Sequence, residues 1–203
     1  MLTCADIRAV GPGVWNGWKG QLLRTLYYET EPLVAGGHTH VRRNERIAQA
    51  QAALREGLSS WPTAEVDHFI ARHYQSYWLR TDTATQVEHA ALLRHAQGAK
   101  TKLATRVKTD AFTAITELTV FAPNHPRLLA LFAGACAAAG AIISVAHITT
   151  TRDCYALDTF LLAREFPDDE GELRRAKRIG DMFDRLLQWK ERFQQFLQKT
   201  RPA

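Results

Sequence analysis

The loop at residues 123–129 carries the side chains that are best placed for chemistry. It reads Pro-Asn-His-Pro-Arg-Leu-Leu and joins a strand-like segment to an apolar, helix-like one. The first N–H groups of a helix lack partners within the helix and can bind an anionic group such as a carboxylate. A small anionic or zwitterionic ligand could therefore bind in this loop. Ordinary capping by Asn124 or His125, with Pro126 in the first turn, accounts for the same residues without a ligand.

The eight histidines do not have the spacing of a metal site. His68 and His73 are five residues apart and His89 and His95 are six apart, whereas a helix offers ligand pairs three or four residues apart. We therefore expect surface histidines, and neither a metal nor a cofactor in this chain. The sequence also lacks phosphate-binding, dinucleotide-binding, serine-hydrolase and zinc-protease motifs, so no catalytic apparatus is predicted. Three cysteines without paired spacing favour a reducing, cytoplasmic setting.

Composition and charge exclude several classes of protein. The chain has 203 residues, 46% of them hydrophobic and 23% charged, which excludes a largely disordered chain. The basic run 174–178 has no aromatic residues on which bases could stack, so we expect no nucleic-acid binding and interpret the run as an exposed helix face. The uncharged segment 128–146 is nearly long enough to span a bilayer. Gly140 and the β-branched residues after it indicate instead a buried helix followed by a strand.

The pattern of apolar residues changes near residue 100. Before it, apolar residues recur at helical spacing; after it, a polar, threonine-rich stretch at 98–111 leads into an alternation typical of a half-buried strand. Thr83 and Gln86 have the form of a capping box. The predicted helices lie at about 15–33, 44–58, 62–73, 83–97, 127–139 and from 168 onward, and the predicted strands at 115–121, 141–150 and 155–165.

These elements predict an α+β fold. An all-helical N-terminal half is followed by a ferredoxin-like βαββα domain with an antiparallel sheet. The last strand of that fold is in doubt, because residues 192–199 have helical rather than alternating spacing. The open sheet edge would favour dimers. Dimers are also favoured by apolar side chains beyond what one small sheet can cover, namely Phe183, Leu186, Leu187 and Trp189.

Two parts of the chain resemble one enzyme family. Residues 116–129, with Gly-Ala-Cys-Ala-Ala-Ala-Gly-Ala at 134–141 and Ala-Leu-Asp-Thr at 156–159, are similar to the first ACT domain of the bifunctional uridylyltransferase/uridylyl-removing enzymes, which modify the PII nitrogen-signalling protein. Residues 3–12 and 15–27 resemble the end of the HD domain of the same family. The resemblance implies a remnant of the HD domain at 1–35, a helical linker at 36–110 and an ACT domain with an extended C-terminal helix at 111–203.

The resemblance implies a regulatory part of an enzyme. The family has a nucleotidyltransferase domain that uridylylates PII, an HD hydrolase that removes the group, and two ACT domains that sense glutamine. Of the HD metal ligands only one aspartate could remain, at Asp6, and a single carboxylate cannot hold a catalytic metal. Magnesium or another divalent cation is implied for the full-length family. This chain alone is expected to be inactive.

The resemblance also implies a ligand site. In pairs of ACT domains the loop before the first helix faces the second strand of the neighbouring domain, so the implied ligand-binding residues are Asn124, His125, Arg127, Leu128, Ala141, Ile142 and Ile143. Asn124 and Arg127 stand where the family commonly has Asp and Gly, so we expect weak glutamine binding. Cys154 stands where the family's hairpin usually has glycine, at a turn that needs a positive φ and would cost roughly 1 kcal/mol.

The expected partners are glutamine, the PII protein through the full-length enzyme, and a second copy of the chain through the ACT sheets. We expect neither a membrane nor a nucleic acid as a partner. Two other interpretations stay open: a free-standing ACT-type module that binds an amino acid or dimerises, and a helical RNA-associated protein that uses the run 174–178. A steep dependence of binding on salt would mark the RNA-associated protein.

Overall fold

The computed structural model describes residues 23, 26–27, 30, 39–99 and 101–199. Asp6 lies outside these residues, as does almost all of the segment that resembles an HD domain. The helices that precede the sheet are α3 (Thr39–Gly57), α4 (Thr63–Arg72), α5 (Gln75–Arg80) and α6 (Thr83–Gly98). They confirm the helices expected at 44–58, 62–73 and 83–97, and α5 is an additional short helix. We call α3–α6 the helical module.

Each helix of this module buries one side in a common core, and α6 has an acidic N-cap. The N-cap of α6 is Asp82 rather than Thr83, because the Asp82 carboxylate accepts the N–H of Thr85 at 2.9 Å. The Gln86 amide donates to the carbonyl of Thr81 at 2.6 Å, so it reaches back as a capping box requires but to a different group. An acidic N-cap also suits the helix dipole. The module's core includes Leu54, Val66, Phe69, Trp78 and Leu93.

The second half of the chain is built on a four-stranded antiparallel sheet. Its strands are β1 (Ala104–Asp110), β2 (Ile115–Pro123), β3 (Ile143–His147) and β4 (Tyr155–Ala163), in the order β1-β2-β4-β3. With α7 (Leu128–Ala138) and α8 (Asp169–Lys199) they confirm the α+β class. Residues 190–199 belong to the helix α8 and form no strand.

Without a last strand, the expected βαββα sheet would have an open edge at β2. This expectation is wrong, because β1 occupies that edge. Ala104 lies opposite Phe121 and Asp110 lies opposite Ile115, so β2 is paired on both sides along most of its length. The strand comes from the threonine-rich stretch at 98–111, within the range that the resemblance assigns to a linker. An early strand therefore fills the place that the expected last strand leaves empty.

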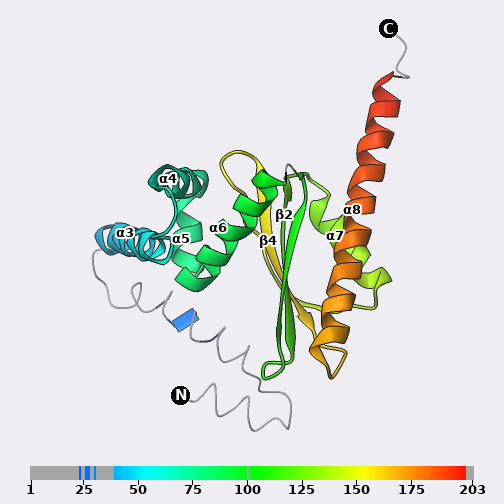
Figure 1. Ribbon diagram of the computed structural model, residues 1–203, viewed down its shortest axis with the longest axis horizontal. Coiled ribbons are helices and arrows are strands. Elements are labelled where there is room, and N and C mark those ends of the chain that lie inside the picture. The colour runs from blue at the N-terminus through cyan, green and yellow to red at the C-terminus, as the bar shows by residue number, and fades with distance from the viewer. Residues whose placement is uncertain (1–22, 24–25, 28–29, 31–38, 100, 200–203) are drawn as a thin grey trace.

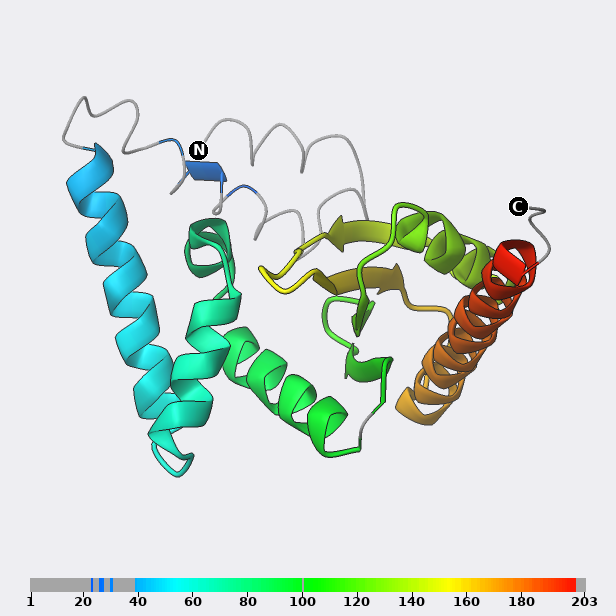
Figure 2. The same cartoon turned by 90° about the horizontal axis from the view of Figure 1, so that it is seen from above.

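Helices cover both faces of the sheet. Figures 1 and 2 show α6 and the rest of the helical module on one side and α7 and α8 on the other. Side chains alternate between the faces along a strand, so Leu118 and Val120 pack in the core under α7 and α8, whereas Phe121 packs in the core of the helical module. Leu157 of β4 also packs in the core of the helical module. The two halves of the chain thus share the sheet.

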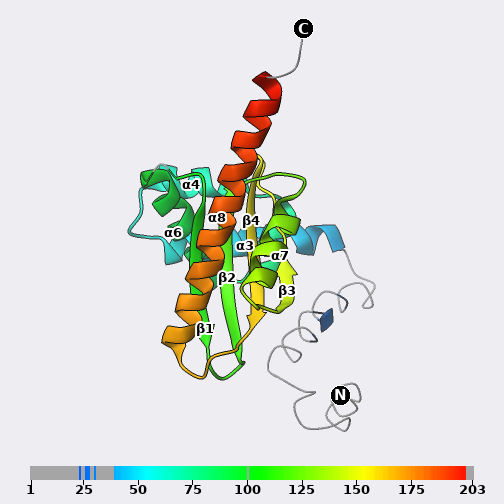
Figure 3. The same ribbon diagram turned by 90° about the vertical axis from the view of Figure 1, so that its right-hand side faces the viewer.

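The long helix α8 lies along the sheet and continues beyond its end (Figure 3). Phe183 is fully buried in the core, and Leu186 and Leu187 pack against it. The expectation that these three side chains exceed what the sheet can cover is therefore wrong. The side chain of Trp189 lies outside what the structure describes. Within the described part of the chain, no helix combines the length and apolar character needed to cross a membrane.

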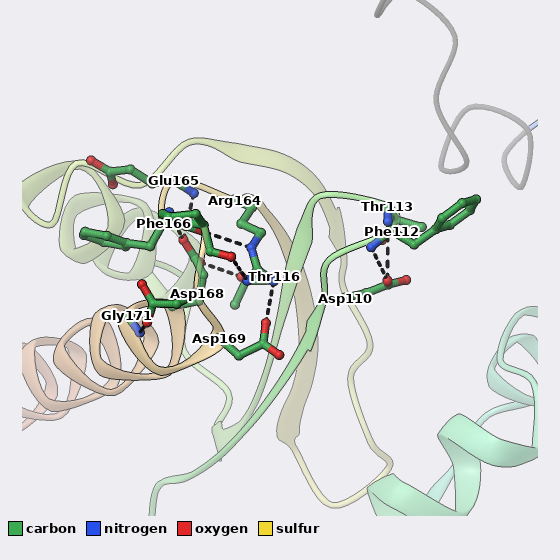
Figure 4. A network of polar contacts seen from close by, with 12 residues as sticks. Asp110, Phe112, Thr113, Thr116, Arg164, Glu165, Phe166, Asp168, Asp169 and Gly171 are labelled. Atoms are coloured by element: carbon green, nitrogen blue, oxygen red, sulfur yellow. Dashed lines mark hydrogen bonds and ion pairs between the residues drawn. The ribbon is translucent and has the colours of Figure 1, made fainter.

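A buried polar network holds the start of α8. The Glu172 carboxylate accepts the N–H groups of Glu165 and Phe166, at 2.7 and 2.8 Å, and the hydroxyl of Thr116 at 2.6 Å. Figure 4 shows Thr116, Glu165 and Phe166 at the start of α8. Arg175 donates to Glu172 at 2.8 Å and is itself buried. The expectation that the whole run 174–178 is an exposed face is thus wrong for Arg175, because its place one turn after Glu172 turns it toward the sheet.

Candidate functional site

The loop between β2 and α7 is held by its own histidine. The N–H of Arg127 donates to Nδ1 of His125 at 3.0 Å, and the N–H of Leu128 donates to the His125 carbonyl at 2.9 Å. The N-cap of α7 is Arg127, without a side-chain cap, so the expected N-cap at Asn124 or His125 is wrong. The His125 ring instead closes the turn 125–127, which ends directly before the helix begins at Leu128.

The base of this loop is tied to the hairpin between β3 and β4. The N–H of Asn124 donates to the Cys154 carbonyl at 2.9 Å, and Pro123 lies opposite Tyr155 in the ladder. Cys154 has φ +60°, the left-handed conformation that the family resemblance implies for a position usually held by glycine. The turn residue therefore carries backbone strain directly beside the candidate ligand loop.

The structure places the expected ligand-binding residues in two separate groups. In the loop, Asn124 and Arg127 are exposed, His125 is half-buried and Leu128 is buried. The other group, at 141–143, follows α7 and begins β3, with Ile142 largely exposed. The eleven residues of α7 separate the two groups by about 16 Å, given a rise of 1.5 Å per residue. One copy of the chain does not bring them together.

Sequence reasoning missed an acidic residue on the α7 side of the sheet. Asp158 alternates with Ala156 and Phe160, which pack in the core under α7, so it lies on the same face of β4. It is buried and lies three residue pairs along the ladder from Pro123. Burial raises the pKa of Asp158 to about 6, although its carboxylate accepts the Thr149 N–H at 3.1 Å. A charged residue in register with core positions was the available signal.

The expectation of surface histidines holds for His68 and His95 but is wrong for His73 and His89. His73 stacks on the ring of Tyr77 at 3.9 Å between centroids, and His89 Nδ1 lies 3.0 Å from the Tyr77 hydroxyl. Both rings are buried: His89 lies on the buried side of α6, and His73 is the C-cap residue that follows α4. Burial lowers the pKa of His73 to about 3 and that of His89 to about 4. Both imidazoles are therefore neutral near pH 7.

No cluster of three or more His, Cys, Asp or Glu side chains that could hold a metal ion occurs in the described ranges. The two cysteines whose surroundings are described, Cys136 and Cys154, are free thiols. The polar features that remain near the β2–α7 loop are an exposed cation at Arg127, a side-chain amide at Asn124 and the first turn of α7. This arrangement suits binding of a small polar molecule.

Comparison with known proteins connects the chain to one group of enzymes. No protein-family model matches the chain. The bifunctional uridylyltransferase/uridylyl-removing enzyme of Rhodopseudomonas palustris is 53% identical to it over 192 residues, which is 95% of this chain and 21% of that protein. The chain is homologous to a segment of these enzymes. The corresponding enzymes of Bradyrhizobium diazoefficiens and Nitrobacter hamburgensis are each 52% identical, over 95% and 92% of this chain.

The homologous segment spans about a fifth of the length of these uridylyltransferase/uridylyl-removing enzymes. The homology confirms the family resemblance found from the residue patterns. The ferredoxin-like βαββα arrangement of β2, α7, β3, β4 and α8 agrees with an ACT-like module in that segment.

Proposed function

We propose that this chain is a regulatory part of a PII uridylyltransferase/uridylyl-removing enzyme and that its ACT-like half binds glutamine weakly. The observation that carries the proposal is the β2–α7 loop, in which an exposed Arg127 stands at the N-terminus of an eleven-residue helix. The N–H groups of Leu129 and Ala130 make no backbone hydrogen bond within the described part of the chain. They and the guanidinium can hold an α-carboxylate.

The loop offers little to the ammonium group of an amino acid. Asn124 supplies only an amide oxygen, and Asp158 is buried away from solvent. A charge-assisted hydrogen bond contributes about 1.5 to 3 kcal/mol, so a ligand held only at its carboxylate binds with a total near −4 kcal/mol, or a Kd of about 1 mM. We propose a Kd for glutamine weaker than this value.

A complete site needs a second copy of the chain. The residues 141–143 lie at the far end of α7, and β3 is an edge strand of the sheet. Ile142 is 69% exposed and Ile148 is 52% exposed, beside a strand edge that can pair with another. We propose that the chain forms a homodimer through the free edge of β3. The edge of β2, where the sequence led us to expect an open edge, is occupied by β1. Sedimentation at tens of micromolar tests it: I142K should shift the chain toward monomer, whereas T105K on the β1 edge should not.

The catalytic activities belong to the longer enzymes in this proposal. PII is a partner of the full-length protein, and a divalent cation would serve the catalytic domains there rather than this chain. Neither uridylylation of PII nor release of UMP from modified PII is expected from the 203 residues alone. Turnover of either substrate by the purified chain would contradict that part of the proposal.

Titration of the ¹⁵N-labelled chain with L-glutamine tests the ligand site. We expect shifts centred on residues 125–131 with a Kd in the millimolar range. R127Q should weaken binding at least several-fold, whereas the matched variant R174Q, which removes an exposed arginine on α8, should leave it unchanged. Shifts confined to other parts of the chain, or equal effects of both variants, would contradict the proposed site.

A further inference from the structure

The tip of the β3–β4 hairpin, residues 149–155, contacts the C-terminal end of α4. The N–H of Arg152 donates to the Arg72 carbonyl at 2.8 Å, and its Nε donates to the His73 carbonyl at 3.3 Å. The carboxylate of Asp153 lies 2.6 Å from the Arg72 guanidinium. Backbone and side-chain bonds thus join the hairpin tip to the helical module.

Arg72 also contacts the strands that lead to the ligand loop. Its side chain is only 8% exposed, and its guanidinium lies 5.4 Å from the ring centroid of Phe121 and 5.5 Å from that of Tyr155. These two rings stack on each other at 4.9 Å. Tyr155 lies opposite Pro123, the last residue before the loop. The same guanidinium therefore contacts both strands at the base of the loop and the tip of the hairpin.

The opposite side of the hairpin tip is bonded to the ligand loop itself. The Cys154 carbonyl accepts the N–H of Asn124, and Cys154 is the residue with positive φ. Two residues earlier, Arg152 makes the bonds to α4. Three consecutive hairpin residues, 152–154, thus connect Asn124 to the end of α4.

A hollow adjoins these contacts. A hollow of about 360 Å³ lies between the helical module and the end of the sheet, with walls from both halves of the chain. Its walls include His68, Gln97, Phe121 and Tyr155. Closely packed cores resist displacement, whereas a hollow at the junction leaves the two halves room to shift about the Arg72–Asp153 contact.

We propose that the hairpin tip couples the 124–128 loop to the helical module. When a ligand moves the loop, the shift of the Cys154 carbonyl is passed to Arg152 and Asp153 and so to the end of α4. The proposal names the regulation of the site proposed above, and only its trigger, glutamine, rests on that function. The coupling itself is a property of the ligand-free chain, because all the bonds that carry it are present without a ligand.

Amide hydrogen exchange in the ligand-free 203-residue chain tests the coupling. R72M removes the guanidinium and keeps a long apolar side chain, and R55M removes an exposed arginine of the same module as the matched control. The exchange rate of the Asn124 amide is divided by that of Leu118, in the middle of β2, to remove changes in global stability. We expect R72M to raise this ratio at least about fivefold, the lower end of typical couplings, and R55M to leave it unchanged.

D153N provides a second variant that changes only the half-exposed partner of Arg72, so it keeps the test valid if R72M does not fold. It should raise the same ratio. An unchanged ratio in both variants overturns the coupling, whether or not the Arg152 amide exchanges faster. If glutamine binds, linkage requires R72M to change its Kd as well; absence of any glutamine binding would contradict the proposed ligand but not the exchange result.

Discussion

Arg175 donates to Glu172 across 2.8 Å at a place where neither side chain is exposed to solvent. The two residues are one helical turn apart at the start of α8, and the carboxylate also receives two backbone N–H groups and a hydroxyl. Burial opposes the charge on Glu172, but these hydrogen bonds together with Arg175 lower the pKa of Glu172 below its ordinary value. The carboxylate therefore remains ionised inside the protein.

Loss of the Glu172 charge should destabilise the fold strongly. E172Q leaves Arg175 with Glu165 as its remaining anionic partner, at 2.9 Å, so the cost should lie near the lower end of the about 3–5 kcal/mol for breaking a buried ion pair from one side. E170Q breaks the pair of Glu170 with Arg174, in which both side chains are exposed, and should cost less than about 0.5 kcal/mol. Urea denaturation at pH 7.5 measures both. Similar free energies of unfolding for the two variants would show that the buried network does not hold α8.

Asp158 should make the protein less stable as the pH rises. Its folded pKa of about 6 is above the ordinary value of 3.8, so its favourable effect is complete below pH 4 and is lost as the pH rises through 6. D158N keeps an oxygen for the Thr149 N–H. We expect it to stabilise the fold at pH 7.5 by up to about 3 kcal/mol, since one pKa unit corresponds to about 1.4 kcal/mol. Denaturation at pH 4 and 7.5 compares the variant with the unmodified chain. A loss of stability of D158N at pH 7.5 would contradict the conclusion that burial disfavours the charged form of Asp158.

His73 should have the opposite pH dependence. Burial lowers its pKa from 6.5 to about 3, with further lowering by His89 and Arg72 and a small opposite effect of Asp153. Its contribution to stability is present above pH 6.5 and is lost as the pH falls toward 3. H73F should therefore gain about 2 kcal/mol relative to the unmodified chain between pH 6 and 4.5. The exposed His68 provides the control H68F, and a parallel pH profile for H73F and the unmodified chain would rule out a buried neutral His73.

Cys154 should be replaceable by glycine with a gain in stability. Its φ of +60° costs a side chain about 1 kcal/mol, which glycine avoids. C154G should raise the free energy of unfolding by about that amount, and A114G, at a second non-glycine residue with positive φ in the described part of the chain, should have a similar effect. Thermal or urea denaturation decides this. Destabilisation by C154G would indicate that the thiol makes contacts worth more than the strain.

The sequence predicted those parts of the fold that have a clear period. Alternation marked β2, helical spacing marked α3 and α4, and a capping pattern marked the start of α6. It missed β1 because Ala104 packs toward the helical module and Val107 toward α8, so the strand shows only one apolar residue on each face and no alternation. Local spacing does not reveal that His89 is buried, because its hydroxyl partner, Tyr77, lies on another helix. The contacts of Arg72 with the hairpin tip join residues about eighty positions apart, which no local pattern reveals.

The most direct test of a glutamine site at the β2–α7 loop is a titration of the unmodified chain and of N124D with L-glutamine. N124D restores a negative charge beside the position expected for the ammonium group. Q97E adds the same charge on α6, beside the hollow at the helical module, and is the matched control. We expect a Kd weaker than about 1 mM for the unmodified chain and for Q97E, and binding at least about fivefold tighter for N124D. Micromolar binding by the unmodified chain, or no response to N124D, would contradict the proposed site.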